Sequence, residues 1–251
     1  MDTRKKNKSD KRFEILGEWP GIKNKIIKDL VGVVFDIVEG LFGRSLPHPV
    51  HVINFPLANN PIACYVMKDG CYQVHLSASS GGFWSQIVYQ LAHELCHLNS
   101  NYSSSIGHKH KWFEEALCEM CSIAVLDKLS KFWNSSTMHG YNKKYAASLK
   151  NYLESLPSMT GYLPENRNAY DAWLVANIDR LEGCSEIREL NGVVAAYLYK
   201  NLFRDQPTAW ACVGMLNKWN CHHDSSFLEF KNSWRKSCAD SIEIKNVLSF
   251  L

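Results

Sequence analysis

Apolar residues are spaced differently in the two halves of this 251-residue chain. From Gly21 to about Gly40 they recur at three- and four-residue steps, which predicts an amphipathic helix. Short β-rich runs follow, separated by turn residues such as Asp69-Gly70. They predict a small antiparallel sheet with three strands: Val50 to Phe55, Ala63 to Met67 and Tyr72 to Leu76.

Helical spacing dominates from Ser85 onwards. Ser85 is expected to cap a helix whose leucines lie on one side and whose Gln90, His93 and His97 lie on another. A second long helix is predicted from near His110 to about Leu129. Further helical patterns continue almost to the end: Tyr141 to Leu156, Ala169 to Glu182, Ile187 to Phe203, Pro207 to Trp219 and Ser226 to Cys238.

These elements predict an α+β fold with three parts along the chain. Residues 1–20 are expected to form a flexible basic tail, because lysine and arginine are concentrated there. Residues 21–130 should form a core that contains the sheet and the first long helices. Residues 131–251 should form a mainly helical C-terminal subdomain that closes a cleft over that core, and tryptophans concentrated in this later part indicate a shared apolar interior.

Composition narrows the possible partners and the compartment. Hydrophobic residues make up 46% of the chain and charged residues 21%, which is typical of a globular protein. A formal net charge of +3 does not favour nucleic acid as a partner. No secretory signal or membrane-spanning run is visible, and the nine cysteines lack the spacing of a disulfide framework. We therefore expect a cytoplasmic protein that binds neither nucleic acid nor membrane.

The stretch from Gln90 to Leu98 contains the pattern H-E-x-x-H within a predicted helix. His93 and His97 are four residues apart, so both imidazoles lie on one face and can converge on one metal ion. Glu94 lies beside them, where it can act as a general base. Such a pattern predicts one Zn²⁺ per chain and a zinc-bound water that Glu94 activates.

A catalytic zinc site needs a third protein ligand, and the segment after His110 offers three acids. Glu115 is preferred, because Glu119 lies one turn later and could orient a ligand histidine through its second ring nitrogen. If Glu114 bound the metal, its neighbour one turn later would be Cys118, a poor orienting group. Cys118 and Cys121 are interpreted as small core residues at helical spacing.

The segments His93 to His97 and Trp112 to Glu119 resemble the gluzincin class of zinc metallopeptidases. The second segment is similar to the W-L-N-E-G-F-A-[ET] signature of zinc aminopeptidases, with Glu115 on the metal-binding glutamate. Their G-x-M-E-N motif does not occur upstream, which favours an endopeptidase-like gluzincin. A weaker likeness is to the ImmA/IrrE type of cytosolic metallopeptidase.

The resemblance implies a zincin-like fold with the site in the crevice between the two halves. It also implies that Tyr72 to Leu76, just before the site helix, is the edge strand that pairs with an extended substrate. The partner would be a peptide or protein substrate. The implied site residues are the metal ligands His93, His97 and Glu115, the base Glu94 and the orienting residue Glu119.

Several alternatives bear on the same residues. The metzincin pattern H-E-x-x-H-x-x-G-x-x-H is excluded, because neither the glycine nor the third histidine follows His97. His108 and His110 could reach the metal, but neighbouring lysines suggest a solvated helix start. Candidates for stabilising the developing oxyanion are Tyr141, Tyr145, Tyr170, Tyr197, Arg188 and the pair His222-His223.

The alternative function is a zincin-fold regulatory or partner-binding protein that holds metal without peptidase turnover. Loss of the base would be expected in such a protein, and Glu94 is present, which favours the enzyme. A further interpretation, in which the motif is an accident of a polar helix face, predicts no bound zinc and no effect of a chelator on melting.

Overall fold

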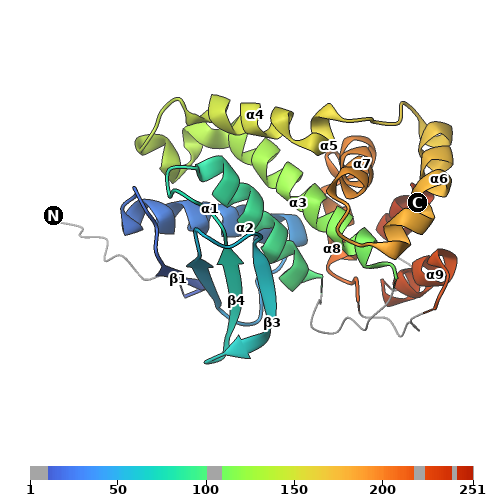
Figure 1. Cartoon of the computed structure of the whole chain (residues 1–251), viewed down its shortest axis with the longest axis horizontal. Coiled ribbons are helices and arrows are strands. Elements are labelled where there is room, and N and C mark those ends of the chain that lie inside the picture. Colours follow the sequence, from blue (N-terminus) through green and yellow to red (C-terminus); the bar gives the residue numbers. More distant parts are fainter. Residues whose placement is uncertain (1–10, 101–108, 218–223, 239–241, 251) are drawn as a thin grey trace.

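The computed structural model describes residues 11–100, 109–217, 224–238 and 242–250. Within these ranges the fold is α+β, with a four-stranded sheet in the order β1-β2-β4-β3 (Figure 1). The strands are β1 (Phe13–Gly17), β2 (Val50–Asn54), β3 (Ile62–Lys68) and β4 (Cys71–Leu76). β2 pairs in parallel with both β1 and β4, whereas β3 pairs antiparallel with β4.

This topology corrects three expectations about the sheet. The sheet is mixed rather than antiparallel, because helix α1 (Asn24–Phe42) lies between β1 and β2 and returns the chain in the same direction. Phe13–Gly17 is a strand and not part of a flexible tail, since Phe13 is buried against Phe35. Tyr72 to Leu76 lies inside the sheet, so the edge strand beside the site helix is β3.

Two helices pack against the sheet, and the second of them forms the candidate site together with a third. Helix α1 (Asn24–Phe42) ends at Gly43, whose left-handed backbone (φ 65°) suits glycine. Helix α2 (Trp84–Asn99) contacts β3, β4 and α1. Its N-cap residue is Phe83 and not Ser85, whose backbone N–H instead donates a hydrogen bond to the Tyr145 hydroxyl oxygen. Helix α3 (Lys111–Phe132) packs along α2.

The helical half follows α3, and the predicted helices there are confirmed apart from their bounds, except for Pro207 to Trp219, where helix continues only to Val213 and residues 218 and 219 lie outside the described ranges. Four tryptophans, Trp112, Trp133, Trp210 and Trp234, are fully buried, as expected for a shared interior. No helix in the described ranges is long and apolar enough to cross a membrane. The α-helices are α4 (Tyr145–Ser155), α5 (Pro157–Thr160), α6 (Arg167–Gly183), α7 (Arg188–Leu198), α8 (Trp210–Val213), α9 (Phe227–Ser237) and α10 (Ile242–Ser249). Shorter turns are η2 (Trp133–Ser135), η3 (Thr137–Gly140), the π-helix η4 (Tyr199–Phe203) and η5 (Pro207–Ala209).

Helix α3 joins the two halves into one core. Apolar residues occupy nearly every side of this helix, and it contacts α2, α4 and α7. Polar residues at its C-terminal end, such as Lys128 and Lys131, are exposed, whereas those at its N-terminal end face the interior or a cavity. The acids at its N-terminal end include Glu114, which is buried, and Glu115, which is partly exposed.

Candidate metal centre

His93 and His97 project from α2 towards α3. They are one helical turn apart, and their ring centroids are separated by 5.1 Å. Leu91 and Leu95, on the other side of α2, are buried in the apolar core and fix the rotation of the helix. The two imidazoles are therefore held side by side by a well-packed helix, as the spacing predicts.

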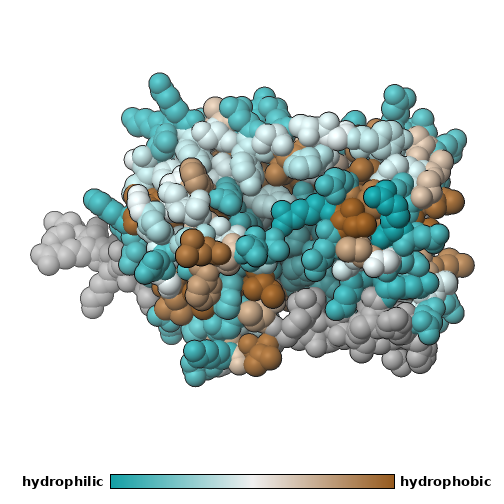
Figure 2. All heavy atoms as spheres, in the orientation of Figure 1, coloured by the Kyte–Doolittle hydropathy of each residue, from teal (hydrophilic) through white to brown (hydrophobic). Residues whose placement is uncertain are grey.

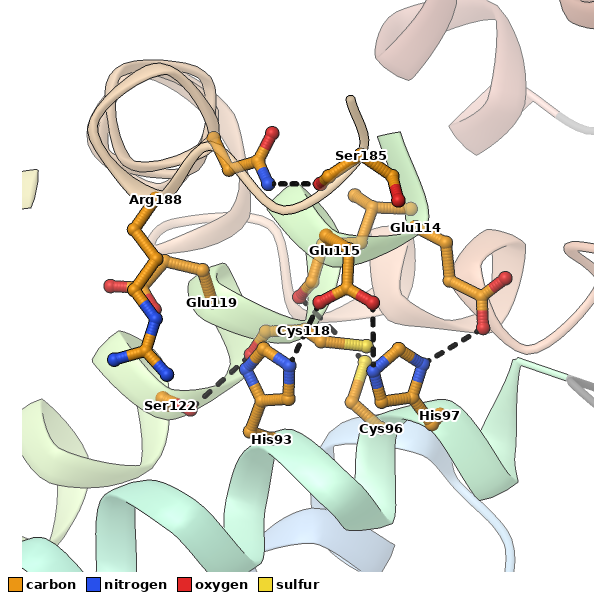
Figure 3. Close-up of polar contacts among 12 residues, drawn as sticks. His93, Cys96, His97, Glu114, Glu115, Cys118, Glu119, Ser122, Ser185 and Arg188 are labelled. Atoms are coloured by element: carbon orange, nitrogen blue, oxygen red, sulfur yellow. Dashed lines mark hydrogen bonds and ion pairs between the residues drawn. The ribbon is translucent and has the colours of Figure 1, made fainter. Parts of the chain in front are cut away.

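Glu115 of α3 lies between the two imidazoles (Figure 3). One carboxylate oxygen is 3.2 Å from Nε2 of His93, and the other is 3.5 Å from Nε2 of His97. Burial alone would raise the pKa of Glu115, but the hydrogen bonds to His93 and His97 outweigh it and hold that pKa far below its ordinary value. The structure thus brings together all three residues that the sequence predicts as metal ligands.

Glu114 holds the opposite side of the His97 ring. Its Oε1 is 2.9 Å from Nδ1 of His97 and also accepts a hydrogen bond from the Ser100 hydroxyl. Its Oε2 accepts a hydrogen bond of 2.8 Å from the side-chain amide of Asn217. An Nδ1–H that donates to Glu114 leaves Nε2 of His97 facing Glu115, which is the tautomer a metal ligand needs.

Glu119 does not contact either histidine, although the sequence assigned it the orienting role. The Tyr89 hydroxyl donates to Oε2 of Glu119, and the Ser158 hydroxyl donates to Oε1 at 3.0 Å. Burial, and then the neighbouring Glu119, raise the pKa of Tyr89 well above its ordinary value. Glu114 occupies the position behind His97 that was expected for Glu119.

Glu94 lies in the same cavity and is 3% exposed. Its pKa is raised, first by burial and further by the charge of Glu115, while His93, His97 and a hydrogen bond with the backbone of Ala63 partly offset the rise. The carboxyl group therefore faces both the histidine pair and strand β3. Its surroundings therefore raise its affinity for a proton.

The cavity above these residues has a volume of about 650 Å³ and three walls. One wall is the start of β3, including Ile62 and Ala63, and another is formed by α2 and α3. The third comes from the helical half, at the beginning of α7. There Arg188 lines the cavity and donates a hydrogen bond of 3.2 Å to Asn60 on the first wall. The helical half thus contributes one wall of the cavity.

Among the proposed oxyanion donors, Arg188 lines this cavity, and the four candidate tyrosines do not. Tyr141 donates to Asp29, Tyr145 bonds to Ser85, and Tyr170 stacks on Tyr197 with the centroids 4.0 Å apart. The pair His222-His223 lies outside the described residues. Nothing in the sequence ranked Arg188 above the others, because its place in the cavity depends on how α7 packs.

Cys118 adds a donor that the sequence did not suggest for the metal. His93, His97 and Cys118 each present a ligand atom, and these atoms lie within 4.8 Å of one another. Two imidazoles with a carboxylate or thiolate beside them form a donor set that fits zinc or a similar transition metal. The residues present therefore satisfy the requirement for the predicted cofactor.

The other histidines considered as ligands do not join this group. His110 is fully buried, and its Nε2 is 2.7 Å from the carbonyl oxygen of Ser225. Its ring packs against Phe227 and Phe230 of α9, away from the cavity. Burial lowers the pKa of His110, although Ser225 and Glu182 oppose the shift. His108 lies outside the described residues.

Comparisons of the chain with protein-family models, with curated proteins and with solved structures found no match.

Proposed function

We propose that this protein is a zinc-dependent metallopeptidase of the gluzincin type. The observation that carries the proposal is the convergence of His93, His97 and Glu115, with Glu115 oxygens 3.2 and 3.5 Å from the two Nε2 atoms. Glu94 lies beside them in a cavity large enough for several residues of a peptide. A zincin-like fold belongs to the same proposal.

Each residue of the site would have a distinct chemical role. His93, His97 and Glu115 would hold the zinc, which when bound lowers the pKa of water and polarises a carbonyl group. Glu94 would take a proton from the attacking water and pass it to the leaving amine. Arg188 lines the cavity and is permanently charged. It would donate hydrogen bonds to the substrate carbonyl or its developing oxyanion.

Strand β3 supports an extended peptide as the substrate. It is an edge strand of the described sheet, and its first residues line the cavity next to Glu94. Ile62, Val66 and Met67 are exposed on it, and apolar side chains gather on the surface around this strand in Figure 2. A peptide that paired with β3 would pass directly over the histidines. The free thiols among the described residues suit a reducing cytoplasm, which stays part of the proposal.

The proposal is tested by separating metal binding from hydrolysis. Glu94→Gln should retain about one zinc by elemental analysis, because Glu94 is not a ligand, and should lose cleavage of a quenched fluorescent peptide library. The matched control is Glu154→Gln, since Glu154 pairs with Lys150 on an exposed helix face away from the cavity. Cleavage by the Glu94→Gln protein at the wild-type rate would reject the mechanism.

A further inference from the structure

Cys118 is a second candidate donor on α3, one turn after the acids that contact the histidines. Figure 3 shows its sulfur in the gap between the two imidazoles, below the Glu115 carboxylate. The side chain is fully buried, so its surroundings are fixed by the packing of α2 against α3. Its position follows from the helix that positions Glu115 and does not depend on a surface loop.

The distances are close to those that a metal centre requires. Zinc binds sulfur at about 2.3 Å and imidazole nitrogen at about 2.0–2.1 Å, so two such donors on one ion lie roughly 3.5 Å apart in a tetrahedral centre. In the metal-free arrangement the three donor atoms already lie within 4.8 Å of one another. Side-chain rotation that shortens the distances between the donor atoms by about 1 Å would let all three bind one ion.

We propose that Cys118 is a direct ligand of the metal that His93 and His97 hold. The centre would then combine imidazole, carboxylate and thiolate donors and would select borderline and soft divalent cations, such as Zn²⁺, Co²⁺ and Cd²⁺, over Mg²⁺ and Ca²⁺. With Glu115 also bound, four protein groups would fill a tetrahedral centre. Cys118 is fully buried and is not among the residues that line the cavity, so its thiolate would approach the ion from the interior, and water or substrate would add from the cavity side as a fifth ligand. This inference rests on the proposed function for the location of the metal.

The test uses the full-length protein loaded with Co²⁺ and a readout that is independent of hydrolysis. Wild type should show thiolate-to-cobalt charge-transfer absorption in the near ultraviolet, and Cys118→Ser should lose it. Cys121→Ser is the matched control, because Cys121 is equally buried on α3 but lies outside the donor group. It should keep the absorption. Visible cobalt bands without the charge-transfer band in wild type would overturn the proposal, as would an unchanged band in Cys118→Ser.

A second measurement needs no substitution in the core. Cadmium-113 NMR of the Cd²⁺-loaded wild type should show the downfield shift that a sulfur ligand causes, and a shift typical of nitrogen and oxygen donors alone would overturn the proposal. Failure of this inference and failure of the proposed function are distinguishable. Glu94-dependent hydrolysis without a sulfur signal rejects only the Cys118 ligand, whereas a sulfur signal without hydrolysis rejects only the peptidase.

Discussion

Glu114 contacts His97 at the ring nitrogen opposite the one that faces Glu115, with 2.9 Å between Oε1 and Nδ1. The two adjacent acids of α3 therefore have different tasks, because successive residues of a helix point about 100° apart. Glu115 faces the cavity, and Glu114 faces the interior. Burial lowers the pKa of His97, but the bonds with Glu114 and Glu115 outweigh burial and raise it well above its ordinary value.

Replacing Glu114 should weaken metal binding without removing a ligand. Glu114→Gln is expected to lower zinc affinity by about 10- to 100-fold, the usual effect of losing the group that orients a ligand histidine. Competition with a fluorescent zinc chelator measures the zinc affinity of each protein. Glu119→Gln is the matched control, since Glu119 contacts Tyr89 and Ser158 and not a histidine. A larger loss of affinity in Glu119→Gln than in Glu114→Gln would restore the role that the sequence assigned to Glu119.

Metal binding should stabilise the folded protein through Glu115. Zinc at 100 times its Kd would add about 2.7 kcal/mol, because the unfolded chain does not hold the three ligands together. Wild type should therefore melt at a higher temperature with zinc than with a chelator. Glu115→Ala should reduce this difference, whereas Glu154→Gln should keep it. An equal zinc response in wild type and Glu115→Ala would exclude Glu115 as a ligand.

His110 should make the protein less stable in mild acid. Burial lowers the pKa of His110 in the folded state below its ordinary value of 6.5. As pH falls below 6.5, the unfolded chain binds a proton that the folded chain does not, so stability falls until the folded pKa is reached. The stability that the neutral, buried His110 contributes is fully present above pH 6.5.

The measurement is urea unfolding of the metal-free protein at several pH values. In His110→Gln the stability should depend less steeply on pH below 6.5, because glutamine does not titrate and can still donate to the carbonyl of Ser225. Both proteins keep the other histidines, so the difference between their unfolding free energies at each pH reports on His110 alone. Parallel stability curves for the two proteins would show that His110 contributes nothing in this range.

Gly192 allows α7 to approach α5 closely, because it has no Cβ atom. A Cβ atom at this position would lie 2.9 Å from the Cβ of Ser158, a contact that requires the helices to shift. Gly192→Ala should therefore destabilise the protein by about 1–3 kcal/mol. It should also disturb the wall that carries Arg188. Thermal melting measures the first effect, and peptide hydrolysis measures the second.

Gly183 provides the comparison for this substitution. It also lies in a helix, and nothing stands within 4 Å of a Cβ atom placed there. Gly183→Ala should be neutral or should stabilise the protein by up to about 1 kcal/mol. Equal melting temperatures for the two alanine variants would contradict the close packing of α5 and α7.

The sequence predicted the parts of the site that depend on spacing within one helix. His93 and His97 converge because four residues make about one turn, and Glu115 was selected from three nearby acids by the same geometry. The helices themselves were predictable because their apolar residues repeat with the period of a buried face. These features need no knowledge of how distant segments pack.

The features that the sequence did not predict depend on packing between distant segments. Strand order is one, because β4 and β3 both have apolar runs and only their pairing decides which is the edge. The exchange of roles between Glu114 and Glu119 is another, since it depends on how α3 is rotated against α2. Cys118 reads as a core residue until the histidines of another helix are placed next to it.

Asn217 connects the candidate centre to the far end of the chain. Its side-chain amide donates both to Glu114 and to the carbonyl oxygen of Ser100, and its backbone adopts a left-handed conformation with φ 61°. During synthesis, both histidines leave the ribosome long before this residue does. The hydrogen bond that holds Glu114 from behind therefore forms only after the chain has been made to residue 217 and has folded back onto α3.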